Sequence, residues 1–272
     1  MESIFTKNTK EALAEFITRW AAIEEIDQEK ALALAASALV YYKAGKKARA
    51  EQRPNQELEK RWYASLTAGE PDYSVYGDQY FLSDIWACWM LYSRKYLLNI
   101  QKNCVGKSID VQNVGSVVDL GCGFGYTTAA LKELFPNAEV YGTNFEGGIQ
   151  WKFAEQVGSE RGFTLAPDVH KLDCQIDLIF ASEYFEHIEN PVEHLEDLLK
   201  TCKPKYIICA NAFGTTSVGH FDDYKHNDAG LFGNLISGKK IGREFNRALR
   251  AAGYSKVKTG CWNDRPNLWK NN

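Results

Sequence analysis

VVDLGCGFG, residues 117–125, is the stretch of sequence that decides the fold of this chain. A β-branched pair leads into an acidic residue, and three glycines then stand at alternate positions. The next residues, 126–131, read YTTAAL and are typical of the start of a helix. This order predicts a buried parallel strand, a tight turn and a helix, a unit that brings backbone N–H groups close to a nucleotide-like ligand. Glycine suits the turn because a Cβ atom would hold the ligand away from the backbone.

The composition is that of an ordinary globular protein. The chain has 272 residues, of which 45% are hydrophobic and 25% charged, and this length allows one large domain or a domain with a cap. No apolar run approaches the ~20 residues of a membrane span, and the N-terminus lacks a signal-peptide pattern. We therefore expect a cytoplasmic protein with no membrane partner.

Cysteine usage argues against a disulfide-rich or zinc-binding protein, and the net charge does not favour a nucleic-acid-binding one. The seven cysteines contain no C-x-x-C pair, which favours buried reduced thiols over a disulfide framework or a zinc site. The formal net charge of −3 does not indicate a nucleic-acid-binding protein, although local basic patches remain compatible with one.

Two regions differ in their predicted secondary structure. Residues 1–104 show helical apolar spacing and no convincing strand, and they include an aromatic helix from about Asp78 to Ile100. From Ser116 onward, segments typical of strands and helices alternate, which is the signature of a doubly wound parallel sheet. We expect an α/β, Rossmann-like, mostly parallel sheet in residues 105–272 and an N-terminal α-helical cap in residues 1–104.

The expected elements of the second region follow from its apolar runs and turn residues. Strands are predicted at 116–120, 139–143, 163–166, 177–182 and 205–210, with one arm of a final antiparallel pair at 255–262. Helices are predicted from 126 to 135, from 147 to 158, from Pro191 onward with Asn190 as the N-cap, and from 245 to 252.

The glycine-rich segment resembles the first motif of the class I S-adenosylmethionine-dependent methyltransferases, which reads much like VVDLGCGFG. The resemblance implies S-adenosyl-L-methionine as the cofactor. In that family, the acidic residue of the motif lies near the methionyl amino end of the cofactor, and the glycine backbone passes close to it. These roles correspond to Asp119 and to the turn of Gly121, Gly123 and Gly125, with Cys122 as a small filler in the turn.

The ends of the second and third strands are the next positions that the resemblance implicates. The family usually places a carboxylate after the second strand to accept both ribose hydroxyls, but this chain has Asn144 there. An amide can hold one hydroxyl well but not both, so either Asn144 suffices or Glu146 supplies the charge. For the adenine amine we expect Asp168 rather than Asp173, although either could be an ordinary solvated loop carboxylate.

The segment DLIFASEYFEHI, residues 177–188, resembles the fourth-strand motif of the same family. It should lie at the carboxyl ends of the strands, where such folds bind ligands. His187 is a candidate general base because the usual pKa of histidine is near neutrality. The alternative is that Glu186 and His187 only order the loop. Glu183 is a second candidate base and a candidate cofactor contact.

A glycine-punctuated loop follows the fifth strand and should cover the mouth of the site. Within it, His220 is a candidate base or substrate contact. Asp222, Asp223 and His226 lie close together in the sequence and could hold a divalent metal ion. Spacing within a loop is weak support for such a site, and no metal is expected.

Aromatic and basic residues bear on the identity of the substrate. Tyr73, Tyr76 and Tyr80 could close over the cofactor or stack on a flat acceptor, although helical aromatics usually belong to the core. Two basic clusters would suit a nucleotide or nucleic acid, although a solvated face is the simpler interpretation. They are Lys239, Lys240, Arg243, Arg247 and Arg250, and Lys46, Lys47, Arg49 and Arg53. An amino-methylating DNA enzyme is not expected, because ASEY stands where that class has an Asn/Asp-Pro-Pro-aromatic motif.

The leading hypothesis is an S-adenosylmethionine-dependent methyltransferase. Its methyl acceptor, a small molecule or a nucleotide or nucleic acid, is not identified by the sequence. One alternative is an enzyme that transfers another part of the cofactor. Another is a catalytically inactive methyltransferase-like module that binds a partner, which the amide at Asn144 keeps open. The sequence leaves the oligomeric state undetermined.

Overall fold

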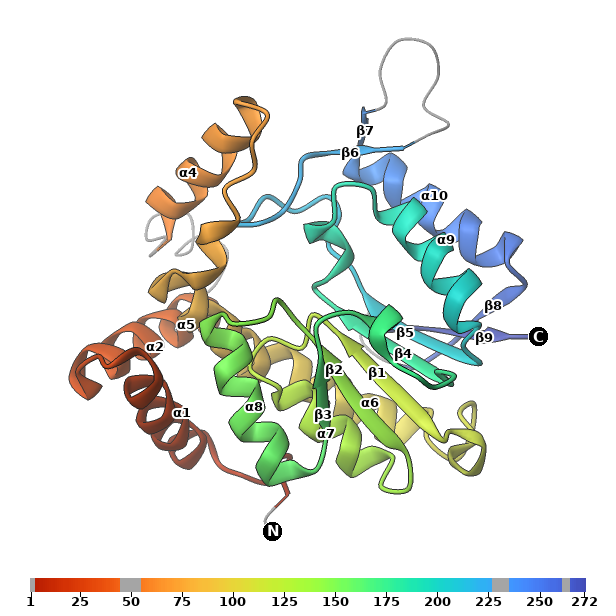
Figure 1. The fold of residues 1–272 in the computed structure, drawn as a ribbon, viewed down its shortest axis with the longest axis horizontal. Helices are drawn as coiled ribbons and strands as arrows, with labels where there is room; N and C mark the ends of the chain where they lie inside the picture. Colours follow the sequence, from red (N-terminus) through yellow and green to blue (C-terminus); the bar gives the residue numbers. More distant parts are fainter. Residues whose placement is uncertain (1–2, 45–54, 227–234, 261–264) are drawn as a thin grey trace.

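The computed structural model describes residues 3–44, 55–226, 235–260 and 265–272 (Figure 1). The basic cluster at residues 46–53 and the end of the strand predicted at 255–262 therefore lie outside the described residues. None of the helices in the described ranges is both long and apolar enough to cross a membrane.

A seven-stranded, mostly parallel sheet forms the centre of the molecule (Figure 1). Its strands are β1 Ser116–Leu120, β2 Glu139–Thr143, β3 Thr164–Ala166, β4 Leu178–Ser182, β5 Tyr206–Ala210, β8 Tyr254–Val257 and β9 Asn267–Asn271. The strand order is β3-β2-β1-β4-β5-β9-β8. Strands β1 to β5 run parallel, whereas β9 pairs antiparallel with both β5 and β8. This arrangement confirms the predicted α/β, Rossmann-like sheet.

Helices cover both faces of this sheet (Figure 1). They include α7 Tyr126–Leu134, α8 Ile149–Arg161, α9 Pro191–Cys202 and α10 Gly238–Ala251. Alternate side chains of a buried strand point to opposite faces. Val117 and Phe180 accordingly pack with α7, α8 and the N-terminal helices, whereas Val118 and Ile179 pack with α9 and α10. The sheet therefore separates two hydrophobic clusters.

The N-terminal region is helical, as predicted. Its helices are α1 Thr9–Glu24, α2 Gln28–Lys43, α4 Gln56–Thr67, α5 Gln79–Cys88 and α6 Arg94–Asn103. A π-helical turn, Trp89–Ser93, joins α5 to α6, so the predicted aromatic helix forms with an interruption. Phe16 of α1 packs against Phe124 of the glycine-rich segment, with 5.2 Å between ring centroids. Because the buried side chains of all these helices belong to hydrophobic clusters that they share with the sheet, a domain boundary at residue 104 stays a prediction.

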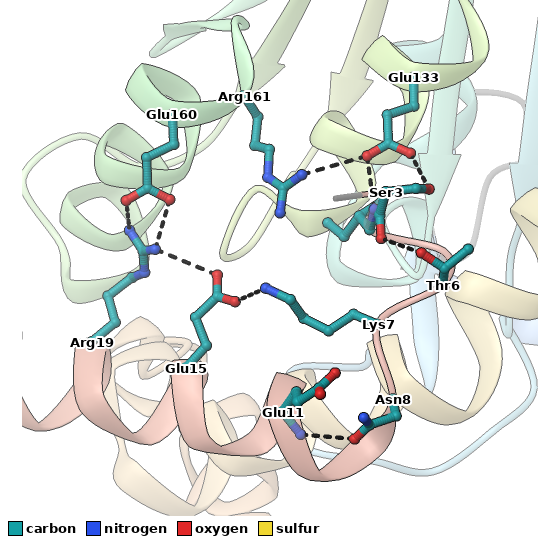
Figure 2. Close-up of polar contacts among 11 residues, drawn as sticks. Ser3, Thr6, Lys7, Asn8, Glu11, Glu15, Arg19, Glu133, Glu160 and Arg161 are labelled. Atoms are coloured by element: carbon teal, nitrogen blue, oxygen red, sulfur yellow. Dashed lines mark hydrogen bonds and ion pairs between the residues drawn. The ribbon is translucent and has the colours of Figure 1, made fainter. Parts of the chain in front are cut away.

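Polar contacts also hold the N-terminal segment against the helices of the sheet (Figure 2). Arg19 of α1 forms a bidentate pair with Glu160 of α8, with N–O distances of 3.0 and 2.9 Å. Glu133 of α7 accepts hydrogen bonds from the backbone N–H of Ile4 at 2.8 Å and from the hydroxyl of Ser3 at 2.5 Å. These contacts fix α1 to α8 and the segment before α1 to α7, whose first turn follows the glycine-rich segment directly.

The C-terminal region departs from the prediction in three places. Helix α10 begins at Gly238 rather than near residue 245. The sequence pattern missed its first turns because their basic residues interrupt the apolar spacing of the helix. The strand predicted at 255–262 ends at Val257, and its antiparallel partner is β9. A separate two-stranded sheet, β6 Asp223–Lys225 with β7 Leu235–Ser237, was not predicted. Asn190 precedes α9 as expected, but its side chain makes no capping hydrogen bond.

Candidate active site

A cavity of about 1000 Å³ opens at the carboxyl ends of the parallel strands. It is lined by the segments that follow β1, β2 and β4, by the loop after β5, and by aromatic side chains of the N-terminal region. The strand order reverses between β1 and β4, and ligands of such folds bind at this switch point. The volume lies at the upper end of the range for small-molecule sites.

The glycine-rich turn after β1 presents its backbone to this cavity. Gly121 and Gly123 line the cavity with φ angles of 65° and 55°, in the left-handed region that favours glycine. A Cβ atom at Gly121 would lie 2.7 Å from the ring of Tyr184, so no side chain fits there. The side chain of Cys122 is buried against Gly142, which agrees with its predicted role as a small filler.

Gly125 has a different position from the one expected. It is the N-cap of α7, and it does not belong to the cavity lining. A Cβ atom there would lie 2.7 Å from the ring of Phe163 and 3.3 Å from the Cα atom of Ala154 in α8. This glycine therefore allows α7 and α8 to pack closely, and its position does not support the predicted contact with a cofactor.

Asp119 is 2% exposed and lines the cavity from the end of β1. The hydroxyls of Thr127 and Thr128 both donate to its Oδ2 atom, at 2.6 and 2.7 Å. Oδ1 makes no hydrogen bond to the described residues and is the oxygen left for a ligand. Burial raises the pKa of Asp119 to about 7, because low-dielectric surroundings disfavour the charged form despite the two hydroxyl donors.

The two candidates for the ribose lie in different environments. Asn144 lines the cavity, and its amide joins two turns. Its Nδ2 donates to the carbonyl of Gly123 at 3.0 Å, and its Oδ1 accepts from the backbone N–H of Phe145 at 2.8 Å. Each end of the amide keeps capacity for one further hydrogen bond. Glu146 is exposed and does not line the cavity, so of the two only Asn144 is placed at the site.

The two candidates for the adenine also separate. Asp168 is exposed and lines the cavity, whereas Asp173 does not belong to the lining. The Oδ1 atom of Asp168 accepts from the backbone N–H of His170 at 3.0 Å and begins a 3₁₀ turn, Val169–Lys171. The other carboxylate oxygen of Asp168 is not used by that turn.

Three titratable side chains, Glu183, Glu186 and His220, meet after β4 and β5, and we call them the polar cluster. One carboxylate oxygen of each glutamate and one ring nitrogen of His220 lie within 4.8 Å of one another. Glu183 lines the cavity and has a φ of 53°, which is unusual for a residue with a side chain. Desolvation by the surrounding protein raises the pKa of Glu183, which is exposed at the cavity, and of the buried Glu186, and the neighbouring Glu183 raises that of Glu186 further.

Glu186 also ties its own loop to the segment after β5, which is the structural role that the sequence analysis gave as an alternative to catalysis. It is 0% exposed within a 3₁₀ turn, Phe185–His187. Its Oε1 atom accepts from the backbone N–H of Ala212, after β5, at 2.8 Å. Its Oε2 atom is buried and makes no hydrogen bond to the described residues.

Two of the histidines that line the cavity, His187 and His220, lie edge to face, with 4.7 Å between their ring centroids. Nδ1 of His220 lies 2.8 Å from the carbonyl oxygen of Thr215. Because a carbonyl only accepts, Nδ1 carries the proton and Nε2 keeps its lone pair. Burial lowers the pKa of His220 to about 4.

His187 lies in an environment that its sequence position did not reveal. Its Nδ1 is 3.0 Å from the hydroxyl of Tyr76. Burial, together with the nearby ring of His220, lowers the pKa of His187 to about 3. The pKa of His187 thus lies below the near-neutral value expected from the residue type, because the partly buried ring is desolvated and lies beside a second histidine.

Sequence reasoning missed several residues of the cavity lining. Asp84 of α5 is 7% exposed and accepts a hydrogen bond of 2.6 Å from the amide of Asn55. Burial raises the pKa of Asp84 to about 7. A single acid inside an aromatic helix was the signal that could have identified it. Arg265 lines the cavity near Glu183, and no local pattern marks it because only tertiary packing brings it there.

The loop carboxylates and the basic helix lie apart from the cavity lining. Within the described residues, Asp222 and Asp223 do not approach His226 closely enough for the three to share a metal ion. Nδ1 of His226 instead lies 2.8 Å from a carboxylate oxygen of Glu193 in α9. The five basic residues of α10 do not line the cavity.

Comparisons with known proteins identify the central part of the chain. Residues 118–205 match a family model described as a methyltransferase domain. A malonyl-[acyl-carrier protein] O-methyltransferase of Priestia megaterium is 26% identical over 131 residues, which cover 46% of this chain and 48% of that protein. The matched region thus spans about half the length of this relative.

A solved structure shows the same fold. It belongs to an O-methyltransferase family protein from Burkholderia thailandensis, with a TM-score of 0.54 at 12% identity over 80% of this chain and 69% of that one. The glycine-rich turn at the cavity lies inside the residues that match the methyltransferase domain. The shared fold, the glycine-rich turn and the domain match together support a class I S-adenosylmethionine-dependent methyltransferase.

Proposed function

We propose that this chain transfers the methyl group of S-adenosylmethionine to an oxygen atom of a small acceptor bound in the cavity. The observation that carries the proposal is the lining of this one cavity. It includes the glycine-rich turn with Asp119 and also Glu183 and His220 of the polar cluster. Methyl transfer needs the cofactor and the acceptor in one enclosed space, because their orientation supplies much of the rate enhancement.

The part of the cavity beside β1 and β2 suits the cofactor. Oδ1 of Asp119 would pair with the ammonium group of the methionyl moiety, since opposite charges in close contact stabilise each other. The bare backbone of Gly121 and Gly123 allows close approach. Asn144 has one acceptor position left and would hold one ribose hydroxyl, and the free oxygen of Asp168 would accept the adenine amine.

The polar cluster suits the acceptor oxygen. A hydroxyl acceptor must lose its proton as the new C–O bond forms and the S–C bond of the cofactor breaks. The carboxylates of Glu183 and Glu186 and the lone pair of His220 can stabilise that loss. Nδ1 of His187 is already bonded to Tyr76, so we assign His187 to positioning this tyrosine rather than to proton transfer.

Oxygen is proposed as the acceptor atom because the Priestia megaterium relative is an O-methyltransferase. A small acceptor is proposed because cofactor and acceptor share about 1000 Å³. Nucleic acid is not proposed, since the basic residues of α10 lie outside the cavity lining.

Titration calorimetry with S-adenosylhomocysteine, followed by turnover assays, tests this function. The account expects binding to the wild type and release of S-adenosylhomocysteine when S-adenosylmethionine is supplied with small hydroxylated or carboxylated acceptors. The product should gain the mass of one CH₂ group, whereas any other gain would indicate transfer of a different group. Wild-type protein that binds no S-adenosylhomocysteine at millimolar concentration would contradict the proposal. Binding without turnover across a broad acceptor panel would favour the inactive binding module.

A further inference from the structure

The polar cluster has the composition of a metal-binding site. Glu183 follows β4, Glu186 lies in the next turn, and His220 comes from the loop after β5. Their ligand atoms lie within 4.8 Å of one another, and within the described residues no other group of three such side chains comes as close. Two carboxylates and an imidazole give a mixed oxygen and nitrogen donor set, which first-row divalent ions accept.

Glu186 gives an independent indication that a ligand belongs here. Its side chain is 0% exposed, and Oε1 is used by the backbone N–H of Ala212. Oε2 is buried without a hydrogen bond, which is costly for a carboxylate oxygen. The carboxylate of Glu183 is its neighbour, so two acidic side chains share this buried position. A cation between them would satisfy both.

His220 is held in the way that metal-ligating histidines usually are. Such histidines donate their second ring N–H to a carbonyl or carboxylate, which fixes the ring and the tautomer. Nδ1 of His220 makes this bond to the carbonyl of Thr215 at 2.8 Å, and Nε2 keeps the lone pair that a metal ion requires. Glu183 also adopts a φ of 53°, a strained conformation of the kind found at functional sites.

We propose that Glu183, Glu186 and His220 bind one divalent first-row transition-metal ion, with Mn²⁺ as the expected type. Carboxylates suit Mn²⁺ and imidazole suits its later neighbours in the row, so a set of two carboxylates and one imidazole lies between them. Ligand atoms that lie within 4.8 Å of one another are near enough to share one ion. Three protein ligands leave coordination positions open to the cavity.

The role of this ion in methyl transfer rests on the proposed function, whereas the site itself does not. An acceptor hydroxyl bound to a divalent ion becomes more acidic, because the ion acts as a Lewis acid. As the proton leaves to water, the acceptor oxygen forms a bond to the methyl carbon. The S–CH₃ bond breaks, its electron pair stays on sulfur, and the sulfonium becomes a neutral thioether.

Binding of Mn²⁺ alone tests the site. The chain is stripped of metal with EDTA, desalted and titrated with MnCl₂ while the electron paramagnetic resonance signal of free Mn²⁺ is followed. We expect one Mn²⁺ per wild-type chain. His220→Ala and Glu186→Gln should each weaken Mn²⁺ binding by about tenfold to a hundredfold or more. Losing a residue that only hydrogen-bonds to a metal ligand already costs about this much, and these two residues are ligands themselves.

Two controls keep the result interpretable. His170→Ala removes a histidine that pairs with Asp197 at 2.9 Å outside the cavity, and it should bind Mn²⁺ like the wild type. Titration with S-adenosylhomocysteine shows that each variant is folded, and Glu186→Gln keeps an acceptor for Ala212 in case His220→Ala unfolds. Wild type that binds S-adenosylhomocysteine but no Mn²⁺ at millimolar concentration would overturn the site. So would a folded His220→Ala variant with wild-type affinity for Mn²⁺.

The fate of this proposal can be separated from that of the proposed function. Stoichiometric Mn²⁺ binding that is lost in the cluster variants supports the site even if no acceptor is ever methylated. Methyl transfer that proceeds at the same rate in EDTA and in Mn²⁺ would overturn the role of the ion while the methyltransferase activity stands.

Discussion

Cofactor binding should weaken below neutral pH, because Asp119 must lose a proton before it can pair with an ammonium group. Burial places the pKa of the free carboxyl at about 7, so about half of these groups are protonated at that pH. Since affinity follows the ionised fraction, the Kd should rise about tenfold from pH 8 to pH 6 and about tenfold more by pH 5. This slope corresponds to about 1.4 kcal/mol per pH unit below the pKa.

Titration calorimetry with S-adenosylhomocysteine at pH 8, 6 and 5 measures this dependence, with circular dichroism to confirm the fold at each pH. Asp119→Asn is the matched control, because its amide oxygen can still accept from Thr127 and Thr128 but cannot ionise. The variant should bind weakly, with a Kd that stays nearly constant over this range. A wild-type Kd that does not change with pH, or a variant with the wild-type slope, would refute the pairing of Asp119 with the ammonium group.

Three substitutions and one control variant test other parts of the structure. Gly121→Ala should weaken S-adenosylhomocysteine binding at least about tenfold, because a Cβ atom would lie 2.7 Å from the Tyr184 ring. Gly69→Ala is the control, because Gly69 also has a positive φ but an added Cβ atom there would have no atom within 4 Å. This variant should bind S-adenosylhomocysteine like the wild type. Equal affinities of the two variants would contradict the close packing at Gly121. The pKa of Asp84 near 7 means that the folded protein holds a proton that the unfolded chain releases, so stability should fall as pH rises from about 4 to about 7. Asp84→Asn should remove about 1.4 kcal/mol per pH unit of that slope, as measured by urea unfolding at pH 5 and pH 7, and an unchanged slope would argue against the buried acid. Arg19→Ala should lower the free energy of unfolding by about 1 kcal/mol through its ion pair with α8 and leave S-adenosylhomocysteine affinity unchanged.

Local sequence predicts the parallel strands well and the C-terminal region poorly. The strands predicted at 116–120 and 139–143 have the bounds of β1 and β2, because each is a short apolar run closed by turn residues. The start of α10 and the strand β9 were not predicted. Their apolar positions are interrupted by Lys and Asn side chains, so no simple period appears, and only the pairing of β9 with β5 defines that strand.

The residues of the candidate site also fall into a group that the sequence predicts and a group that it does not. Asp119, Gly121 and Gly123 could be predicted because one local turn carries all three. The inward position of Asp84 and Arg265 could not, because it depends on contacts between segments far apart in the chain.

The shifted pKa values of the site residues also could not be predicted from the sequence. A sequence gives only the usual pKa of a residue type, whereas burial lowers the pKa of His187 to about 3 and raises that of Asp119 to about 7. Likewise, the sequence offered Glu183, after the fourth strand, and His220, in the loop after the fifth, only as separate candidates. Only the fold of the loop after β5 brings His220 to the two glutamates.

A crystal structure of this chain with S-adenosylhomocysteine tests most directly the claim that cofactor and acceptor share one cavity. The account predicts the ligand along the turn of Gly121 and Gly123, with its amino group at Asp119. Its sulfur should face the space lined by Glu183 and His220, with room beside it for an acceptor. A ligand whose sulfur points away from these two residues, or a cavity too filled by side chains to admit an adenosine, would contradict the account.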